Sequence, residues 1–81
     1  MTVKLRFFAA LRDRAGAAQM TRELPAPLPV GELWESLRRE HAALADYSGS
    51  VRFAVNQEYV DKDYPLQDND EVAFIPPVSG G

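Results

Sequence analysis

The first apolar residues of the chain alternate with polar ones from residue 3 to residue 9. One set of side chains consists of Val3, Leu5, Phe7 and Ala9, and the other of Lys4, Arg6 and Phe8. A period of two predicts a strand with one buried face. Phe8 departs from the pattern, because it is a large aromatic residue on the face that otherwise carries charge.

Further along the chain the period changes. Val30, Leu33, Trp34 and Leu37 recur at helical spacing and predict a main helix over residues 30–41. None of Ser, Thr, Asp or Asn stands at its expected N-cap, so the pattern leaves its first residue open. The other predicted elements are a short helix over 10–15 closed by Gly16, strands over 19–24, 51–55 and 59–60, and a last strand over 71–75.

The connecting segments carry signals of their own. Prolines at 25, 27 and 29 mark a crossover loop, and residues 46–50 are predicted as another loop. Leu66 is expected to enter the core from the turn before the last strand. In the turn over 68–70, Asn69 is the best candidate for a left-handed backbone conformation.

The order of these elements predicts an α+β fold, in which a mixed sheet is covered on one face by one main helix. The 81 residues are enough for one domain with a small core. The sequence shows no internal repeat and no low-complexity tract that would divide it.

Composition and charge narrow the classes of function. A net charge of −3 argues against general nucleic-acid binding, which needs a basic patch, and the absence of cysteine excludes disulfides and thiolate metal sites. The apolar runs are shorter than the roughly 20 residues of a membrane span, and the charged N-terminus does not resemble a signal peptide. We therefore expect a cytoplasmic protein without a membrane partner. No phosphate loop, dinucleotide fingerprint or nucleophile–base pattern is present, which favours a non-enzyme.

The last residues, Gly80-Gly81, follow an apolar strand and a Pro-Pro pair. A carboxylate at such an end is ionised at neutral pH and can act as a nucleophile, and glycines without a Cβ can enter a narrow site on another protein. A frayed chain end is the plainer reading of the glycines alone. Pro76 and Pro77 either end the strand or hold the tail away from it as a semi-rigid spacer, and the two roles are compatible.

Several motifs recur in a familiar order: Phe7-Phe8-Ala9 with Leu11-Arg12 and Gly16, Ala54-Val55-Asn56-Gln57, Asp70-Glu71-Val72-Ala73, and Ile75-Pro-Pro-Val-Ser-Gly-Gly81. Together they resemble the MoaD/ThiS family of ubiquitin-like sulfur carriers, which includes small subunits of molybdopterin synthase. The resemblance covers residues 3–81. It implies a β-grasp domain over residues 1–75 and a flexible tail over residues 76–81. Asn69 stands where the family often has Gly, and the stretch 25–29 lacks the usual helix-capping Thr or Ser.

The resemblance implies a carrier cycle in which partners do the catalysis. A ubiquitin-activating-type adenylyltransferase would use ATP to adenylate the carboxylate of Gly81, and a sulfur donor would displace AMP to leave a thiocarboxylate. The large subunit of molybdopterin synthase would then pass the sulfur to cyclic pyranopterin monophosphate. The expected assembly is a heterotetramer of two small and two large subunits, and the chain itself is expected to bind no cofactor.

The resemblance also implies a docking patch for the large subunit. It consists of Phe8, Tyr59 and Ile75. The partner is also expected to bind the tail residues Pro76, Pro77, Val78 and Ser79, which lead to the reactive end at Gly80 and Gly81. Strand parity turns Phe8 and Ile75 away from the core, and exposed aromatic residues are typical anchors of an interface. Scattered exposed apolar residues are the plainer alternative. Arg12 is expected either to contact the activating enzyme or to be a solvated helix charge.

Two further features carry weaker signals. An acidic run lacks the spacing and the turn glycine of a calcium loop. It is predicted to form a pair of solvated turns, or to steer the protein towards a basic partner surface; its residues are Asp61, Asp63, Asp68, Asp70 and Glu71. His41, the only histidine, is expected at a helix end without a catalytic role.

Other functions remain open from the sequence. A sulfur carrier for thiazole or for a thiolated tRNA base shares the fold and the Gly-Gly end, although such carriers generally lack the Phe-Phe-Ala opening and the Ile-Pro-Pro-Val-Ser ending. A protein modifier would form isopeptide bonds with partner lysines. A plain β-grasp binding module would have an inert tail.

Overall fold

The computed structural model of this chain describes residues 1–47 and 50–76. In chain order its elements are β1 (Thr2–Phe7), α1 (Ala9–Ala15), β2 (Gln19–Glu23), α2 (Val30–Glu40), α3 (Ala42–Ala45), β3 (Arg52–Val55), β4 (Glu58–Val60) and β5 (Glu71–Ile75). Each predicted strand and helix is present within one or two residues of its expected bounds. The sequence pattern does not predict α3, a single turn that directly follows α2.

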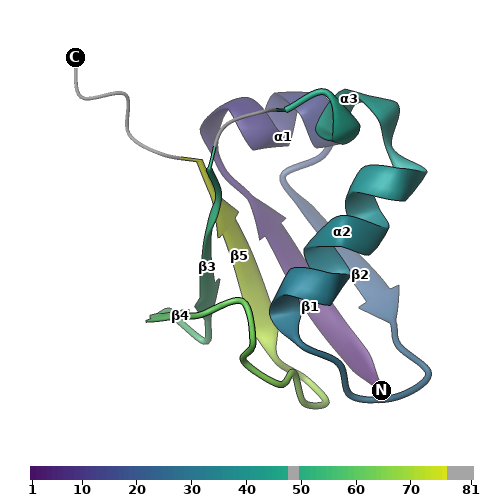
Figure 1. Cartoon of the computed structure of the whole chain (residues 1–81), viewed down its shortest axis with the longest axis vertical. Coiled ribbons are helices and arrows are strands. Elements are labelled where there is room, and N and C mark those ends of the chain that lie inside the picture. Colours follow the sequence, from purple (N-terminus) through teal and green to yellow (C-terminus); the bar gives the residue numbers. More distant parts are fainter. Residues whose placement is uncertain (48–49, 77–81) are drawn as a thin grey trace.

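The five strands form one mixed sheet in the order β2-β1-β5-β3-β4. β1 and β5 are parallel, and the other neighbours are antiparallel. The helix α2 crosses one face of the sheet, and α1 and α3 gather at the end towards which β1 and β5 point (Figure 1). The predicted α+β arrangement of a mixed sheet under one main helix is therefore confirmed. The proposed division at residue 75 stays a prediction, because residues 77–81 lie outside the described part.

The core lies between the sheet and α2, with Phe74 of β5 at its centre. The ring of Phe74 stacks on Phe7 at 5.3 Å and lies 5.2 Å from Trp34, and Phe53 meets it edge-on at 5.9 Å. Leu66 is fully buried, as predicted, although it belongs to a connection without regular structure. Removing a side chain as central as Phe74 would cost about 3–5 kcal/mol.

The chain begins α2 without a capping side chain. Pro29 occupies the N-cap position, and the first two helical amides donate instead to backbone carbonyls of the segment between β4 and β5. Val30 N–H donates to the oxygen of Tyr64, and Gly31 N–H donates to the oxygen of Lys62, both over 2.9 Å. These bonds satisfy two of the amides that a helix start leaves unpaired, which explains how α2 begins without the expected Ser or Thr.

Left-handed backbone conformations occur in the tight turns and at the end of α1. Gly16 closes α1 at φ 78° and Asn69 adopts φ 70°, so both predictions are confirmed. Asn56 (φ 53°) and Gln57 (φ 73°) form the two-residue turn between β3 and β4. Two positive φ values in succession are typical of a hairpin turn that matches the twist of its strands.

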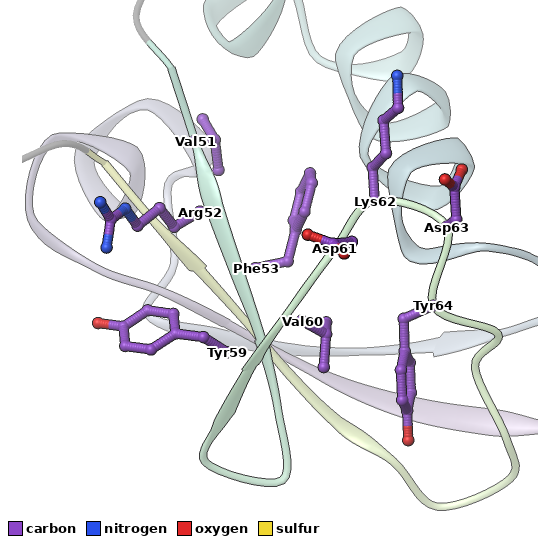
Figure 2. Close-up of a pocket in the computed structure, with 9 residues that line it drawn as sticks. All are labelled: Val51, Arg52, Phe53, Tyr59, Val60, Asp61, Lys62, Asp63 and Tyr64. Carbon is purple, nitrogen blue, oxygen red and sulfur yellow. The ribbon is translucent and has the colours of Figure 1, made fainter.

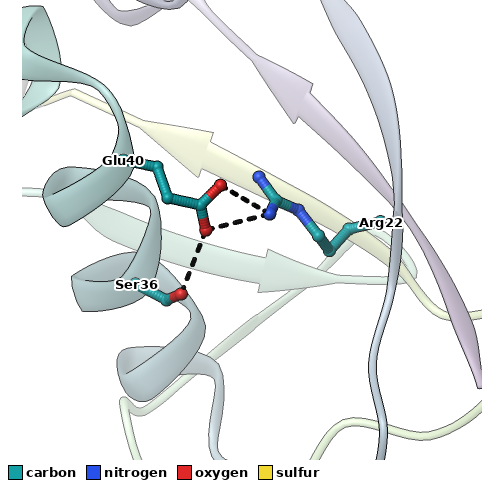
Figure 3. Close-up of polar contacts among 3 residues, drawn as sticks. All are labelled: Arg22, Ser36 and Glu40. Atoms are coloured by element: carbon teal, nitrogen blue, oxygen red, sulfur yellow. Dashed lines mark hydrogen bonds and ion pairs between the residues drawn. The ribbon is translucent and has the colours of Figure 1, made fainter.

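Arg22 lies on the inward face of β2, where its charge interrupts an apolar pattern. Its guanidinium reaches across to α2 and donates to both oxygens of Glu40, at 2.8 and 2.9 Å, while Ser36 donates to the same carboxylate at 3.3 Å (Figure 3). The hydrogen bond from Arg22, together with its charge, lowers the pKa of the Glu40 carboxyl below its ordinary value. The pair thus joins the edge strand to the helix at the rim of the core.

Candidate functional site

Phe8 and Ile75 lie next to each other at the ends of two parallel strands. The register pairs Phe7 with Phe74, and Phe8 N–H donates to the carbonyl oxygen of Phe74 at 3.4 Å. Because Phe7 and Phe74 point into the core, the residues that follow them point to the opposite face of the sheet. Phe8 is 39% exposed and Ile75 is half-buried. The structure therefore brings these two predicted docking residues together on the face that α2 leaves open.

Phe8 is held at this position by the abrupt start of α1. It is extended (φ −114°, ψ 150°) and is the N-cap of the helix, while the next residue, Ala9, adopts φ 51°. A positive φ is costly for a residue with a Cβ and is seen mainly where the surrounding structure imposes it. The expectation that Ala9 continues the buried side of β1 is wrong, because this backbone reversal turns Ala9 to the surface.

Tyr59 of β4 belongs to the same face and is 66% exposed. It lies opposite Ala54 in the register, and the guanidinium of Arg52 lies 5.8 Å from the centre of its ring. Arg52 is in turn the cross-strand partner of Ile75. Figure 2 shows Arg52 and Tyr59 on one side of the β3–β4 hairpin, with Phe53 on the other. Arg52 thus connects Tyr59 to Ile75.

Arg6 supplies a second cation on this face. Its guanidinium lies 5.4 Å from the centre of the Phe8 ring and 3.6 Å from a carboxylate oxygen of Glu71. Cations over aromatic rings at such distances are attracted by the negative face of the ring. The sequence patterns do not mark Arg6 or Arg52 as site residues. Strand parity places Arg6 with Phe8, but only the pairing of β3 with β5 places Arg52 beside Ile75.

We call this surface the docking face. It is the part of the open side of the sheet formed by β1, β5, β3 and β4, and its members are Lys4, Arg6, Phe8, Arg52, Ala54, Tyr59, Glu71, Ala73 and Ile75. The two alanines lie in its middle, with larger side chains around them. Exposed aromatic and arginine side chains such as those around them are enriched in protein–protein interfaces.

The other side of the hairpin carries a shallow groove, which Figure 2 shows from the edge of the sheet. Phe53, Val60 and Tyr64 contribute its apolar part, and Lys62 and Asp63 lie beside them. Phe53 and Val60 are half-buried against the core cluster, so this groove is an extension of the core towards solvent. Arg52 and Tyr59 of the docking face also line it, so the groove adjoins the docking face at the β3–β4 hairpin.

The tail begins directly at the docking face. Pro76 follows the last residue of β5 and is half-buried. The other predicted tail positions, Pro77, Val78, Ser79, Gly80 and Gly81, lie outside the described residues. Since β5 ends at Ile75, Pro76 follows the strand on the side where Phe8 lies.

Arg12 does not join the docking face through any described contact. It lies on the exposed side of α1, and its side chain is 58% exposed with the carboxylate of Asp13 at 3.9 Å. This geometry agrees with a solvated helix charge. A contact with an activating enzyme stays a prediction.

The acidic run does not form a pair of fully solvated turns, because the side chain of Asp70 is buried, with only 8% of its surface exposed. Its carboxylate accepts hydrogen bonds from Asn56 Nδ2 at 3.0 Å and from the amide of Gln67 at 2.8 Å. Asn56 Oδ1 in turn accepts from the amide of Glu71 at 3.0 Å. That part of the prediction is wrong, because the strand pairing brings the β3–β4 turn against the 67–70 turn and encloses Asp70 between them.

Within residues 1–47 and 50–76, no three His, Asp or Glu side chains are grouped so that they would hold a metal ion. None of the helices in this described part is long and apolar enough to cross a membrane. His41 is half-buried between α2 and α3, and its amide donates to the carbonyl oxygen of Leu37 over 2.9 Å. The predicted helix-end position of His41 is confirmed.

The chain is similar to proteins of a known family. The model of the ThiS family matches residues 5–81. A molybdopterin synthase sulfur carrier subunit from Chlamydomonas reinhardtii is 42% identical over 84 residues, which cover 100% of both chains. These matches confirm the resemblance noted from the motifs.

Two solved structures are similar over nearly the whole chain. One is a chain of a complex of subunits 1 and 2 of molybdopterin-converting factor from Helicobacter pylori, which is 27% identical with a TM-score of 0.71 and covers 100% of both chains. The other is small archaeal modifier protein 1 from Methanosarcina acetivorans, which is 26% identical with a TM-score of 0.80, covering 99% of this chain and 96% of that chain. Together with the observed sheet, these similarities confirm the predicted ubiquitin-like β-grasp fold.

Proposed function

Since the chain belongs to the ThiS family, we propose that it is a sulfur carrier that supplies molybdopterin synthase during biosynthesis of the molybdenum cofactor. The sulfur is carried on the carboxyl group of Gly81 as a thiocarboxylate. Its acceptor in the synthase is cyclic pyranopterin monophosphate.

The observation that carries this proposal is the match to a molybdopterin synthase sulfur carrier subunit over the full length of both chains. Two further observations support it. The family match extends through Gly80 and Gly81, and the docking face lies where β5 ends and Pro76 begins. An interface on this face would place the residues that follow Ile75 next to the partner.

The chemistry needs two steps before sulfur is donated. A free carboxylate is a poor electrophile, so an activating enzyme first joins it to the α-phosphate of ATP and releases pyrophosphate. A sulfur donor at the oxidation level of hydrosulfide then attacks the carbonyl carbon. The new C–S bond forms as the C–O bond to AMP breaks, and AMP is the leaving group. The resulting thiocarboxylate is a better nucleophile than the original carboxylate.

In this proposal the chain is a cosubstrate and the partners provide the catalytic side chains. The activating enzyme is an adenylyltransferase of the ubiquitin-activating type, and it consumes the ATP, so the carrier needs no cofactor of its own. The acceptor complex pairs two carriers with two large subunits in the cytoplasm. The similarity to a solved complex of subunits 1 and 2 of a molybdopterin-converting factor supports the large-subunit partner.

A second candidate is a protein modifier whose terminal carboxyl group forms isopeptide bonds with lysines of other proteins. The similarity to small archaeal modifier protein 1 favours it, because the two chains share their fold over nearly their full lengths. A modifier produces covalent adducts of higher mass in cells, whereas a carrier that serves only small-molecule synthesis produces none. Immunoblots of cell lysates under denaturing conditions separate the two candidates.

The experiment that tests the carrier proposal is the intact mass of the protein after incubation with ATP, the adenylyltransferase from the same organism and a sulfur donor. The expected result is a mass gain equal to one oxygen replaced by sulfur, located at Gly81 by fragmentation. A variant that lacks Gly81 is the control and is expected to gain nothing. An unchanged mass with an adenylyltransferase that is active on another carrier would contradict the proposal.

A further inference from the structure

The docking face differs in charge from the protein that carries it. The whole chain has a net charge of −3. The docking face, in contrast, has three cations, Lys4, Arg6 and Arg52, and one carboxylate, Glu71. The docking face is therefore basic within an acidic molecule.

The acidic run does not cancel this charge. Asp61 and Asp63 belong to the segment that follows β4 and line a groove that Arg52 also borders (Figure 2). No ion pair among the described residues joins either carboxylate to Arg52. Asp68 and Asp70 precede β5, at the end of the strand opposite to Ile75. Only Glu71 reaches the docking face, and it already lies 3.6 Å from Arg6.

Arg52 is the cation that most needs a partner in a complex. It stands between Ile75, its cross-strand neighbour, and Tyr59, whose ring centre is 5.8 Å from its guanidinium. None of the ion pairs among residues 1–47 and 50–76 includes Arg52. A protein that covers Ile75 and Tyr59 also covers Arg52, and burying a guanidinium without an opposite charge is strongly unfavourable.

We propose that the partner surface that covers the docking face carries a carboxylate opposite Arg52, so that Arg52 is a specificity-determining residue of the interface. This inference rests on the proposed function, in which the partner is the large subunit of molybdopterin synthase. Arginine is suited to the role, because its planar group can stay stacked on Tyr59 while its edge donates two hydrogen bonds to a carboxylate. The same charge attracts an acidic surface from a distance and raises the association rate at low salt.

The test measures the association of the chain with the large subunit from the same organism, by stopped flow, at about 50 mM and about 500 mM NaCl. Arg52→Gln removes the charge from the docking face, and Arg39→Gln removes one from the exposed side of α2 as a matched control. We expect the association rate constant of Arg52→Gln to be about three- to tenfold lower than that of the unaltered chain at low salt. The difference is expected to be smaller at high salt. Arg39→Gln is expected to bind like the unaltered chain.

Arg52→Lys separates charge from ring stacking. It keeps the positive charge and is expected to retain most of the low-salt association rate, whereas behaviour like that of Arg52→Gln would contradict a carboxylate partner. Equal or tighter binding by Arg52→Gln would also overturn the inference, and tighter binding would indicate a basic partner surface. If the unaltered chain does not bind the large subunit at all, the proposed function fails as well, so the two failures are distinguishable.

Discussion

The amide of Gly31 donates to the carbonyl oxygen of Lys62 over 2.9 Å, and the two residues are in such close contact that no side chain fits between them. A Cβ at position 31 would lie 2.9 Å from Cβ of Lys62 and 3.1 Å from its carbonyl oxygen. The first turn of α2 is therefore fixed to the segment between β4 and β5. The two atoms of Lys62 that would be contacted, its carbonyl oxygen and its Cβ, are part of the backbone or bonded directly to it. They therefore cannot move aside as the end of a flexible side chain would.

This contact makes Gly31→Ala destabilising, although alanine is the better helix former by about 1 kcal/mol. The clash is expected to outweigh that gain and to lower the free energy of unfolding by about 1–2 kcal/mol. Urea denaturation followed by circular dichroism measures the change. Arg39→Ala, on the exposed side of the same helix, is the control and is expected to stay within about 0.5 kcal/mol of the unaltered chain.

Asp70 is expected to contribute to stability, in spite of its place in an acidic run. Asp70→Ala leaves Asn56 Nδ2 and the amide of Gln67 without their acceptor in a half-buried site. The expected loss is about 1–3 kcal/mol in the free energy of unfolding. Asp68→Ala removes one exposed acceptor, which receives the amide of Thr2 at 2.7 Å, and serves as the comparison. A loss at position 70 no larger than that at position 68 would contradict this account.

Glu40 gives stability a dependence on pH. The hydrogen bond from Arg22 lowers the pKa of this carboxyl in the folded state, so folding favours the ionised form. The contribution is complete above about pH 4.5, the ordinary value of the group, and is lost as pH falls through the lowered folded value. Because the side chain of Glu40 is 45% exposed, solvent screening keeps the contribution below about 1 kcal/mol.

The measurement compares the unaltered chain with Glu40→Gln in urea between pH 3 and pH 7. The difference in stability is expected to shrink as pH falls below about 4.5, because a protonated Glu resembles Gln. It is also expected to shrink in high salt. A difference that grows on acidification would show that the ion pair with Arg22 is not its source.

Phe8→Ala is expected to weaken binding to the large subunit by about 1 kcal/mol or more, because the ring is an exposed aromatic of the docking face. Tyr64→Ala is a matched control, since Tyr64 is similarly exposed at 37% but belongs to the segment between β4 and β5 and not to the docking face. Isothermal titration calorimetry measures both. Equal affinities for the Phe8 variant and the unaltered chain would remove Phe8 from the interface.

One residue added after Gly81 is expected to abolish sulfur transfer, because the proposed adenylate forms on the carboxyl group of Gly81 itself. The extended protein would keep its docking face and should still bind the large subunit with unchanged affinity. Intact mass spectrometry detects the missing thiocarboxylate, and the binding assay shows that the domain is folded. Full sulfur transfer by the extended chain would refute the terminal-carboxylate mechanism.

Two residues of the docking patch, Phe8 and Ile75, can be predicted from the alternation within their strands and from the motif resemblance. Phe8 and Ile75 each follow a core residue at the end of an alternating strand, so their outward direction is a property of each strand alone. The position of Arg52 between Ile75 and Tyr59 depends on the register of the β3–β4 hairpin against β5, a strand that follows later in the sequence. The alternation of residues within one strand gives no information on its register with other strands. For this reason the sequence does not predict that Arg52 lies beside Ile75.

Hydrophobic periodicity and backbone sterics act over a few neighbouring residues, so they suffice to predict the strands, the face that α2 buries and the turns at Gly16 and Asn69. The start of α2 and the burial of Asp70 depend on contacts between segments that are far apart in the chain. The amides of α2 are satisfied by carbonyls about 30 residues later in the chain, and Asp70 is enclosed by a turn 14 residues before it. Such pairings between distant segments arise from packing, and no local pattern specifies them.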